Sequence, residues 1–201
     1  MKKILLFMAV ALMISMTVYA APRKRAAAVA VPVPVLATGE WSAYNDTSDN
    51  GTSTATIRKA EETINGENVT VYYISGNVTT KFQYGFAGWT LDPDEATLAL
   101  YKSAKAISFW VLGDGKAYSV KFKTSNVKDF GYLEYRFSTE PGEPVFIEVP
   151  IAYFMQPSWA QPVKKSPELV TGIEWQTHES WRKAGDVNPF EIKFWNFKVH
   201  N

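Results

Sequence analysis

Two segments of the chain alternate polar and apolar side chains, as a ligand-binding face of a β-sheet would. In residues 131–137, alternation places three apolar or aromatic side chains on one face: Leu133, Tyr135 and Phe137. The opposite face then carries an aromatic, an acidic and a basic side chain: Tyr132, Glu134 and Arg136. In residues 173–178, Ile173 and Trp175 point inward, and the outward side chains are Glu174, Gln176 and His178. Both outward faces are candidates for ligand binding.

These residue types favour carbohydrate binding. Sugar rings carry apolar C–H faces that stack on aromatic rings, and sugar hydroxyls need planar polar partners. The chain has seven Trp, ten Tyr and twelve Phe, which is more than a core of this size needs. The residues alone leave two interpretations open: a sugar-binding face, or a solvated outer face with one incidental tyrosine.

Catalytic patterns are weak. His178 lies beside Glu179 and Ser180, but adjacent side chains do not form a catalytic triad. Neighbouring carboxylates such as Asp92 and Asp94 occur, whereas a glycosidase needs two carboxylates that face each other across a cleft. The chain has no cysteine and two histidines, which excludes a cysteine nucleophile and an iron–sulfur cluster and argues against a zinc site. The sequence predicts a protein that binds and does not catalyse, with a polysaccharide hydrolase or lyase as an alternative.

An oxygen-rich segment, residues 44–51, is the candidate for a metal site. Its carboxylates are Asp46 and Asp49, and calcium favours flexible loops of carboxylates and carbonyls. The segment does not match an EF-hand loop. A structural calcium ion and a plain turn are both compatible with it, and no other cofactor is expected.

The N-terminus has the features of a signal peptide. Lys2 and Lys3 precede an apolar run, Ile4–Val18, and a cleavage site after Ala20 follows. The run is shorter than the roughly 20 residues that span a bilayer. The sequence therefore predicts a secreted or periplasmic protein with a signal peptide at residues 1–20 and no membrane insertion after cleavage.

The rest of the chain divides into a linker and a domain. Residues 21–38 are rich in Pro, Val and Ala and are expected to be a linker, and residues 39–201 have the length of one domain. The first 38 residues hold five of the 21 basic residues and none of the 20 acidic ones, so the domain has 16 basic and 20 acidic residues. This acidic excess argues against a nucleic-acid partner.

The sequence pattern of the domain predicts an all-β fold. Turn residues separate segments rich in aromatic and β-branched side chains, and Asn65-Gly66 predicts a hairpin. One segment, Pro93–Leu100, predicts a helix with Asp92 as its N-cap. Strands are expected at residues 40–45, 53–60, 67–76, 82–91, 105–112, 117–124, 131–138, 144–150, 168–176 and 189–199. This pattern predicts a two-sheet jelly-roll β-sandwich.

A series of loose motifs resembles one galactose-binding-like jelly-roll group. That group joins carbohydrate-binding module family eleven with the complex I intermediate-associated protein family. The motifs span residues 39–201 and are, in order, Trp41 with Asp46 and Gly51–Ile57, Tyr84–Gly88, Ile107–Tyr118, Val145–Pro150 with Phe154 and Trp159, and Phe190–Val199.

The resemblance implies a jelly roll whose concave sheet, in the carbohydrate-binding members, cradles a β-glucan chain with Tyr, Arg and acidic side chains. The positions here that match such roles are Tyr132, Glu134, Arg136, Gln176, His178 and Trp181. It implies a non-catalytic protein that holds a polysaccharide or oligosaccharide. The other branch of the group acts in assembly of a respiratory complex. The alternative is a structural or protein-interaction domain of the cell envelope that docks a protein partner and binds no sugar.

Overall fold

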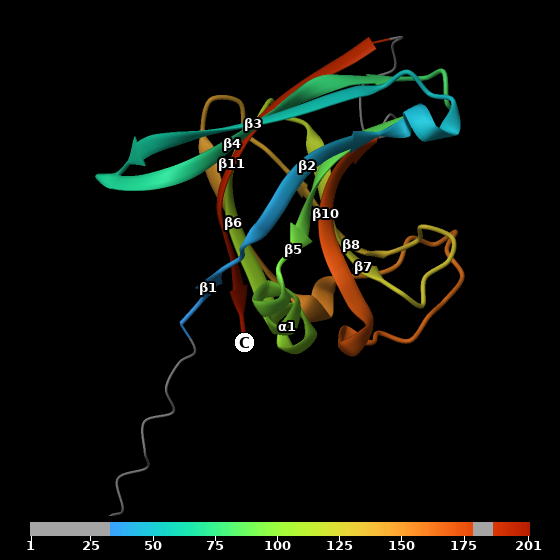
Figure 1. Ribbon diagram of the computed structural model, residues 1–201. Coiled ribbons are helices and arrows are strands. Elements are labelled where there is room, and N and C mark those ends of the chain that lie inside the picture. The colour runs from blue at the N-terminus through green and yellow to red at the C-terminus, as the bar shows by residue number, and fades with distance from the viewer. Residues whose placement is uncertain (1–32, 179–186) are drawn as a thin grey trace, which may run out of the picture. The chain divides into compact units, whose positions relative to one another are not determined.

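The structure is a computed structural model that describes residues 33–178 and 187–201. The described chain forms two antiparallel β-sheets around a hydrophobic core (Figure 1). This confirms the predicted all-β jelly-roll sandwich, and each strand expected from the sequence overlaps a strand of the structure.

The six-stranded sheet has the order β3-β4-β11-β6-β9, with β1 beside β11. Its strands are β1 (Val35–Leu36), β3 (Thr54–Ile64), β4 (Glu67–Thr79), β6 (Ala106–Leu112), β9 (Pro144–Pro150) and β11 (Val187–His200). The five-stranded sheet has the order β2-β5-β10-β7-β8. Its strands are β2 (Gly39–Asn45), β5 (Phe86–Pro93), β7 (Ala117–Thr124), β8 (Leu133–Ser138) and β10 (Val170–His178).

Short helices connect some of these strands. They are the 3-10 helices η1 (Asp46–Asp49), η2 (Ile151–Tyr153) and η3 (Pro167–Leu169), and the α-helix α1 (Glu95–Ser103). The predicted hairpin turn joins β3 to β4, where Asn65 and Gly66 both have a positive φ, 53° and 84°. Two positive φ angles match the twist of the flanking strands, and asparagine and glycine reach them at low cost.

Aromatic side chains dominate the core between the sheets. Trp89 and Trp175 stack with ring centroids 5.9 Å apart and an interplanar angle of 4°. The ring centroid of Phe194, from the other sheet, lies 4.8 Å from that of Trp175. All three side chains are fully buried. The sequence suggested that the chain has more aromatic residues than its core needs. Many of these side chains nevertheless lie in the core and are not available to a binding surface.

The described part of the expected linker takes part in the fold. Val35 and Leu36 pair with Val199 and Lys198 of β11, and Ala37 is buried in the core. The folded domain thus includes residues upstream of the expected start at Gly39.

Helix α1 begins later than the sequence predicted. Asp94 is its N-cap, and Asp92, expected in that role, belongs to β5. Asp94 Oδ1 accepts a hydrogen bond from Thr97 N (2.8 Å), and Asp94 Oδ2 accepts one from the Thr38 hydroxyl (2.5 Å). The Asp92 prediction was wrong because the contact with Thr38 is long-range and invisible in the local pattern. Within the described ranges, no helix has the length and hydropathy needed to span a bilayer.

Candidate functional site

The outer face of the five-stranded sheet carries two rows of side chains that cross all five strands. Pairing aligns residues of neighbouring strands on the same face. The first row, from β2 to β8, is Tyr44, Gly88, Gln176, Ser119 and Arg136. The second row is Ser42, Thr90, Glu174, Lys121 and Glu134. We call these ten residues, with Tyr132, Lys123 and His178 at their borders, the polar face.

The centre of the polar face is buried. Glu174 and Gln176 are each 8% exposed, and Lys121 is 9% exposed. The outward direction of Glu174 and Gln176 agrees with the predicted alternation, whereas their burial does not fit a solvated outer face, one of the two interpretations that the residues left open. At the edges Tyr44 is half-buried and Arg136 is exposed. The polar face therefore has a buried charged centre, which the isolated strands do not reveal.

Gly88 makes room for Tyr44. A Cβ atom at Gly88 would lie 2.8 Å from Cζ of Tyr44 and 2.1 Å from the carbonyl oxygen of Trp175, so the tyrosine ring lies over a bare stretch of backbone. The Tyr44 hydroxyl donates to the Trp175 carbonyl (3.2 Å) and interacts with the side chains of Glu174 and Gln176. Burial, and then the charge of Glu174, raise the pKa of Tyr44 well above its usual value, so its hydroxyl stays a donor.

Charged groups of both signs alternate at the centre. Lys121 Nζ donates to Oε1 of Gln176, and Lys123 Nζ lies 3.9 Å from Oε2 of Glu174. Burial lowers the pKa of Lys121, against the opposing effect of Glu174 and Glu134. Burial raises the pKa of Glu174, against the opposing effect of Lys121 and Lys123. For both groups, the loss of water outweighs the attraction of the neighbouring charges.

The β8 side holds three of the predicted site residues together. Arg136 Nε pairs with Glu134 Oε1 at 3.1 Å. Tyr132 is half-buried, and burial followed by the charge of Glu174 raises the pKa of its hydroxyl. The predicted residues on β8 and β10 thus meet on one face, and Trp181 lies outside the described residues.

His178 ends strand β10 at the border of the polar face. Burial, followed by the positive charges of Lys121 and Arg136, lowers its pKa to about 4. The imidazole is therefore neutral at physiological pH. It can accept or donate one hydrogen bond without adding charge to the site.

Acid should destabilise the protein through His178. Because its native pKa of about 4 lies below the ordinary 6.5, the unfolded chain binds more protons between these values. The native state then loses stability as the pH falls from 6.5 to 4, by roughly 1 kcal/mol after allowance for the partial exposure of the ring. Urea denaturation at pH 7 and pH 5 should show a smaller loss for His178→Gln than for the wild type. An equal loss in both proteins would contradict this assignment.

Tyr44 and Lys121 belong to the polar face, although the sequence did not single them out as site residues. Tyr44 belongs to the oxygen-rich segment, whose sequence pattern indicates a metal site or a turn and not a sugar-binding face. Residues 119–123 alternate polar and apolar side chains, with Lys121 at the centre of the outward side. This pattern alone places Lys121 on an outward strand face. Only strand pairing shows that both side chains converge on β10.

The calcium prediction concerns Asp46 and Asp49 of η1. Asp46 is fully buried, and its carboxylate accepts hydrogen bonds from Ser53 N (2.9 Å), the Ser53 hydroxyl (2.7 Å) and Phe86 N (3.3 Å). Hydrogen-bond donors around a carboxylate do not fit a cation, and the described residues contain no group of three or more His, Asp or Glu that could hold a metal. Asp46 acts here as a structural hydrogen-bond acceptor, and calcium binding stays a prediction.

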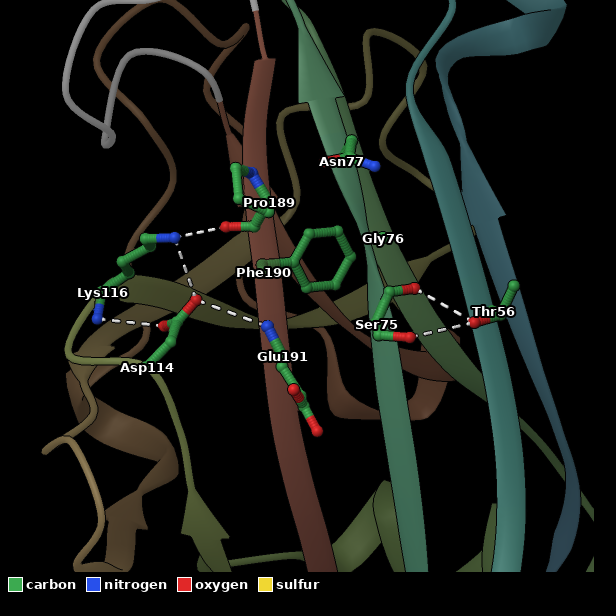
Figure 2. A pocket seen from close by; sticks show the side chains of 9 residues that line it. All are labelled: Thr56, Ser75, Gly76, Asn77, Asp114, Lys116, Pro189, Phe190 and Glu191. Carbon is green, nitrogen blue, oxygen red and sulfur yellow. Dashed lines mark hydrogen bonds and ion pairs between the residues drawn. The ribbon is translucent and has the colours of Figure 1, made fainter.

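A cavity of about 580 Å³ lies on the other sheet (Figure 2). The Phe190 ring lies against Gly76, and Lys116 pairs with Asp114 at 3.3 Å and donates to the Pro189 carbonyl. Asp114 also accepts a hydrogen bond from Glu191 N (3.4 Å). Lys116 and Asp114 already engage each other and the backbone of β11, so this cavity is a weaker candidate for a ligand site than the polar face.

The two antiparallel sheets define the class of protein, a jelly-roll β-sandwich. The chain belongs to the complex I intermediate-associated protein 30 (CIA30) family, whose family model matches residues 35–173. No curated protein matches the chain.

Solved structures that are similar to this chain include the following three. One is the family 11 carbohydrate-binding module of a cellulosomal cellulase of Clostridium thermocellum, with 16% identity, a TM-score of 0.52, and coverage of 85% of this chain and 95% of that module. An exo-β-agarase has 10% identity, a TM-score of 0.46, and coverage of 83% and 25%. The module TmCBM61, in complex with β-1,4-galactotriose, has 13% identity, a TM-score of 0.28, and coverage of 80% and 88%. The likeness to the family 11 module shows a shared fold.

Proposed function

We propose that the polar face holds a polysaccharide chain, of β-glucan type, and that the protein binds this chain without cleaving it. The observation that carries the proposal is the pair of rows across five strands, with buried Glu174, Gln176 and Lys121 at their centre. A sugar needs this combination of planar acceptors, amide groups and cationic donors for its hydroxyls. The fold shared with the family 11 module supports the proposal.

The charge pattern favours an uncharged ligand. Lys121 lies in one row with Glu174 and Glu134, and Arg136 of the other row pairs with Glu134, so neither sign of charge dominates the face. A phosphate or nucleic-acid site would need a surplus of cations. Paired charges can instead donate to and accept from the many hydroxyls of a neutral sugar.

The carboxylates support binding over catalysis. Glu134 pairs with Arg136, and Glu174 lies near Lys123, so each has a cationic partner. Both rise from the same sheet face, whereas a glycosidase places its two carboxylates on opposite sides of the scissile bond. The raised pKa of Glu174 has burial as its main cause, which is also what a buried binding centre requires.

Affinity electrophoresis of the full-length protein tests the proposal. Gels would contain β-glucan, xylan or no polysaccharide. We expect β-glucan to retard the wild type, and Arg136→Ala or Tyr132→Ala to weaken binding by about tenfold, since each removes contacts worth about 1.4 kcal/mol. Arg58 and Tyr73 supply a matched control, because their stacked pair lies on the other sheet, with the guanidinium 3.6 Å from the ring centroid.

The outcomes separate binding from catalysis. Arg58→Ala and Tyr73→Ala should bind like the wild type. Absence of retardation in every gel, or equal loss in the control variants, would contradict the proposed site. Release of reducing ends from β-glucan during incubation would show that the protein is an enzyme.

A further inference from the structure

Three large apolar side chains lie exposed beyond the β8 edge of the polar face. Phe130, Met155 and Trp159 are 76%, 62% and 66% exposed. Met155 and Glu134 exchange two backbone hydrogen bonds, of 2.9 and 3.0 Å, in an isolated antiparallel bridge. Bridged residues share a face, so Met155 extends the row of Lys121 and Glu134 past the last strand.

Phe130 is held in an unusual backbone conformation. Its φ of 62° lies in the left-handed region, which bulky residues rarely adopt. The Phe130 carbonyl accepts from Tyr132 N (2.9 Å), and Asp129 Oδ1 accepts from Gly131 N (3.0 Å), so the turn is fixed on both sides. The exposed ring contributes little to the core. A strained backbone that presents an exposed aromatic ring suggests a functional role for that ring.

Trp159 is presented by a second fixed turn. Ala160 N donates to the Pro157 carbonyl (3.0 Å), which places Trp159 at the tip of a turn. A Cβ atom on Gly131 would lie 2.2 Å from Cβ of Ala160, so the turn is packed directly against the Phe130 segment.

Side chains tie the two turns together. Asp129 Oδ2 accepts from Gln161 N (2.6 Å), and Gln156 Nε2 donates to the Gly131 carbonyl (2.8 Å). Gln156 Oε1 also accepts from Val163 N (2.8 Å). The two exposed aromatic residues therefore stand on a framework that is ordered without a ligand, which reduces the entropy lost on binding.

We propose that Phe130 and Trp159 form an aromatic platform for sugar rings where a polysaccharide leaves the polar face at its β8 edge. This inference rests on the proposed function. The five strands already span about 19 Å at roughly 4.8 Å per strand spacing, so a chain that also reaches the platform is several sugar rings long. The site then recognises the interior of a long chain, and short oligosaccharides fill only the polar face.

Isothermal titration calorimetry of the full-length protein with cellotriose and cellohexaose tests the platform. We expect Trp159→Ala to weaken cellohexaose binding by about threefold to tenfold, the range of a lost ring contact, and to leave cellotriose binding unchanged. Phe146→Ala is the matched control, because Phe146 is 47% exposed and lies on the other sheet.

Phe130→Gly gives an independent readout. Glycine adopts a positive φ without strain, so this variant should unfold at a higher temperature than the wild type while it loses cellohexaose affinity. A lower unfolding temperature, or an equal effect of Trp159→Ala on both oligosaccharides, would overturn the platform. If Trp159→Ala and Phe130→Gly both bind cellohexaose with the affinity of the wild type, the platform is overturned and the proposed function is not. A wild type that binds neither oligosaccharide overturns the β-glucan proposal and the platform together.

Discussion

Asp46→Ala should lower the free energy of unfolding by about 3–5 kcal/mol, the cost of breaking a buried charged network. The Asp46 carboxylate is fully buried and accepts three hydrogen bonds, two from Ser53 and one from Phe86 N. The Ser53 hydroxyl in turn accepts from Thr79 N (3.0 Å). The network therefore joins η1 to the beginning of β5 and the end of β4, and its loss leaves several buried donors without an acceptor.

Urea denaturation of the wild type, Asp46→Ala and Asp49→Ala measures this effect. Asp49 is exposed in the same 3-10 helix, and its replacement should change stability by less than about 0.5 kcal/mol. Equal stability of Asp46→Ala and the wild type would refute the structural role. The same proteins test the calcium prediction, since added Ca²⁺ should raise the unfolding temperature of the wild type alone if Asp46 binds the ion.

The double variant Lys121→Met with Glu174→Gln should be more stable than the wild type, by roughly 1–4 kcal/mol, and should lose polysaccharide binding. Burial is the main cause of both pKa shifts, downward for Lys121 and upward for Glu174, so each charge costs stability in the native state. Neutral side chains of similar shape remove that cost. A site that keeps two buried charges at the expense of stability is expected where those charges serve binding.

A double-mutant cycle measures the coupling between the two charges. Each single variant loses the attraction between Lys121 and Glu174, and the double variant loses this attraction only once. The free energy of unfolding of the double variant should therefore be higher than the sum of the two single effects predicts. Affinity electrophoresis in β-glucan gels measures the polysaccharide binding of the same single and double variants. If the double variant is less stable than the wild type by more than about 1 kcal/mol, the charges are structural and the binding role is wrong.

The sequence determined which side chains share a strand face. Alternation has a period of two residues and is a local property, so it groups Tyr132, Glu134 and Arg136 by itself, and likewise Glu174 and Gln176. The strand content and the jelly-roll class followed from the same local signals. The signal peptide at residues 1–20 and Trp181 lie outside the described residues and remain sequence predictions.

The tertiary structure decided which faces meet and how deeply they are buried. Tyr44 reaches β10 across 131 positions of sequence, and Lys121 pairs with β10 across 55. The capping of α1 depends on Thr38, 56 positions before Asp94. Such contacts depend on strand order and register, which local propensity does not encode. The burial of Glu174 and the shifts in pKa that follow from it are therefore properties of the assembled sheet.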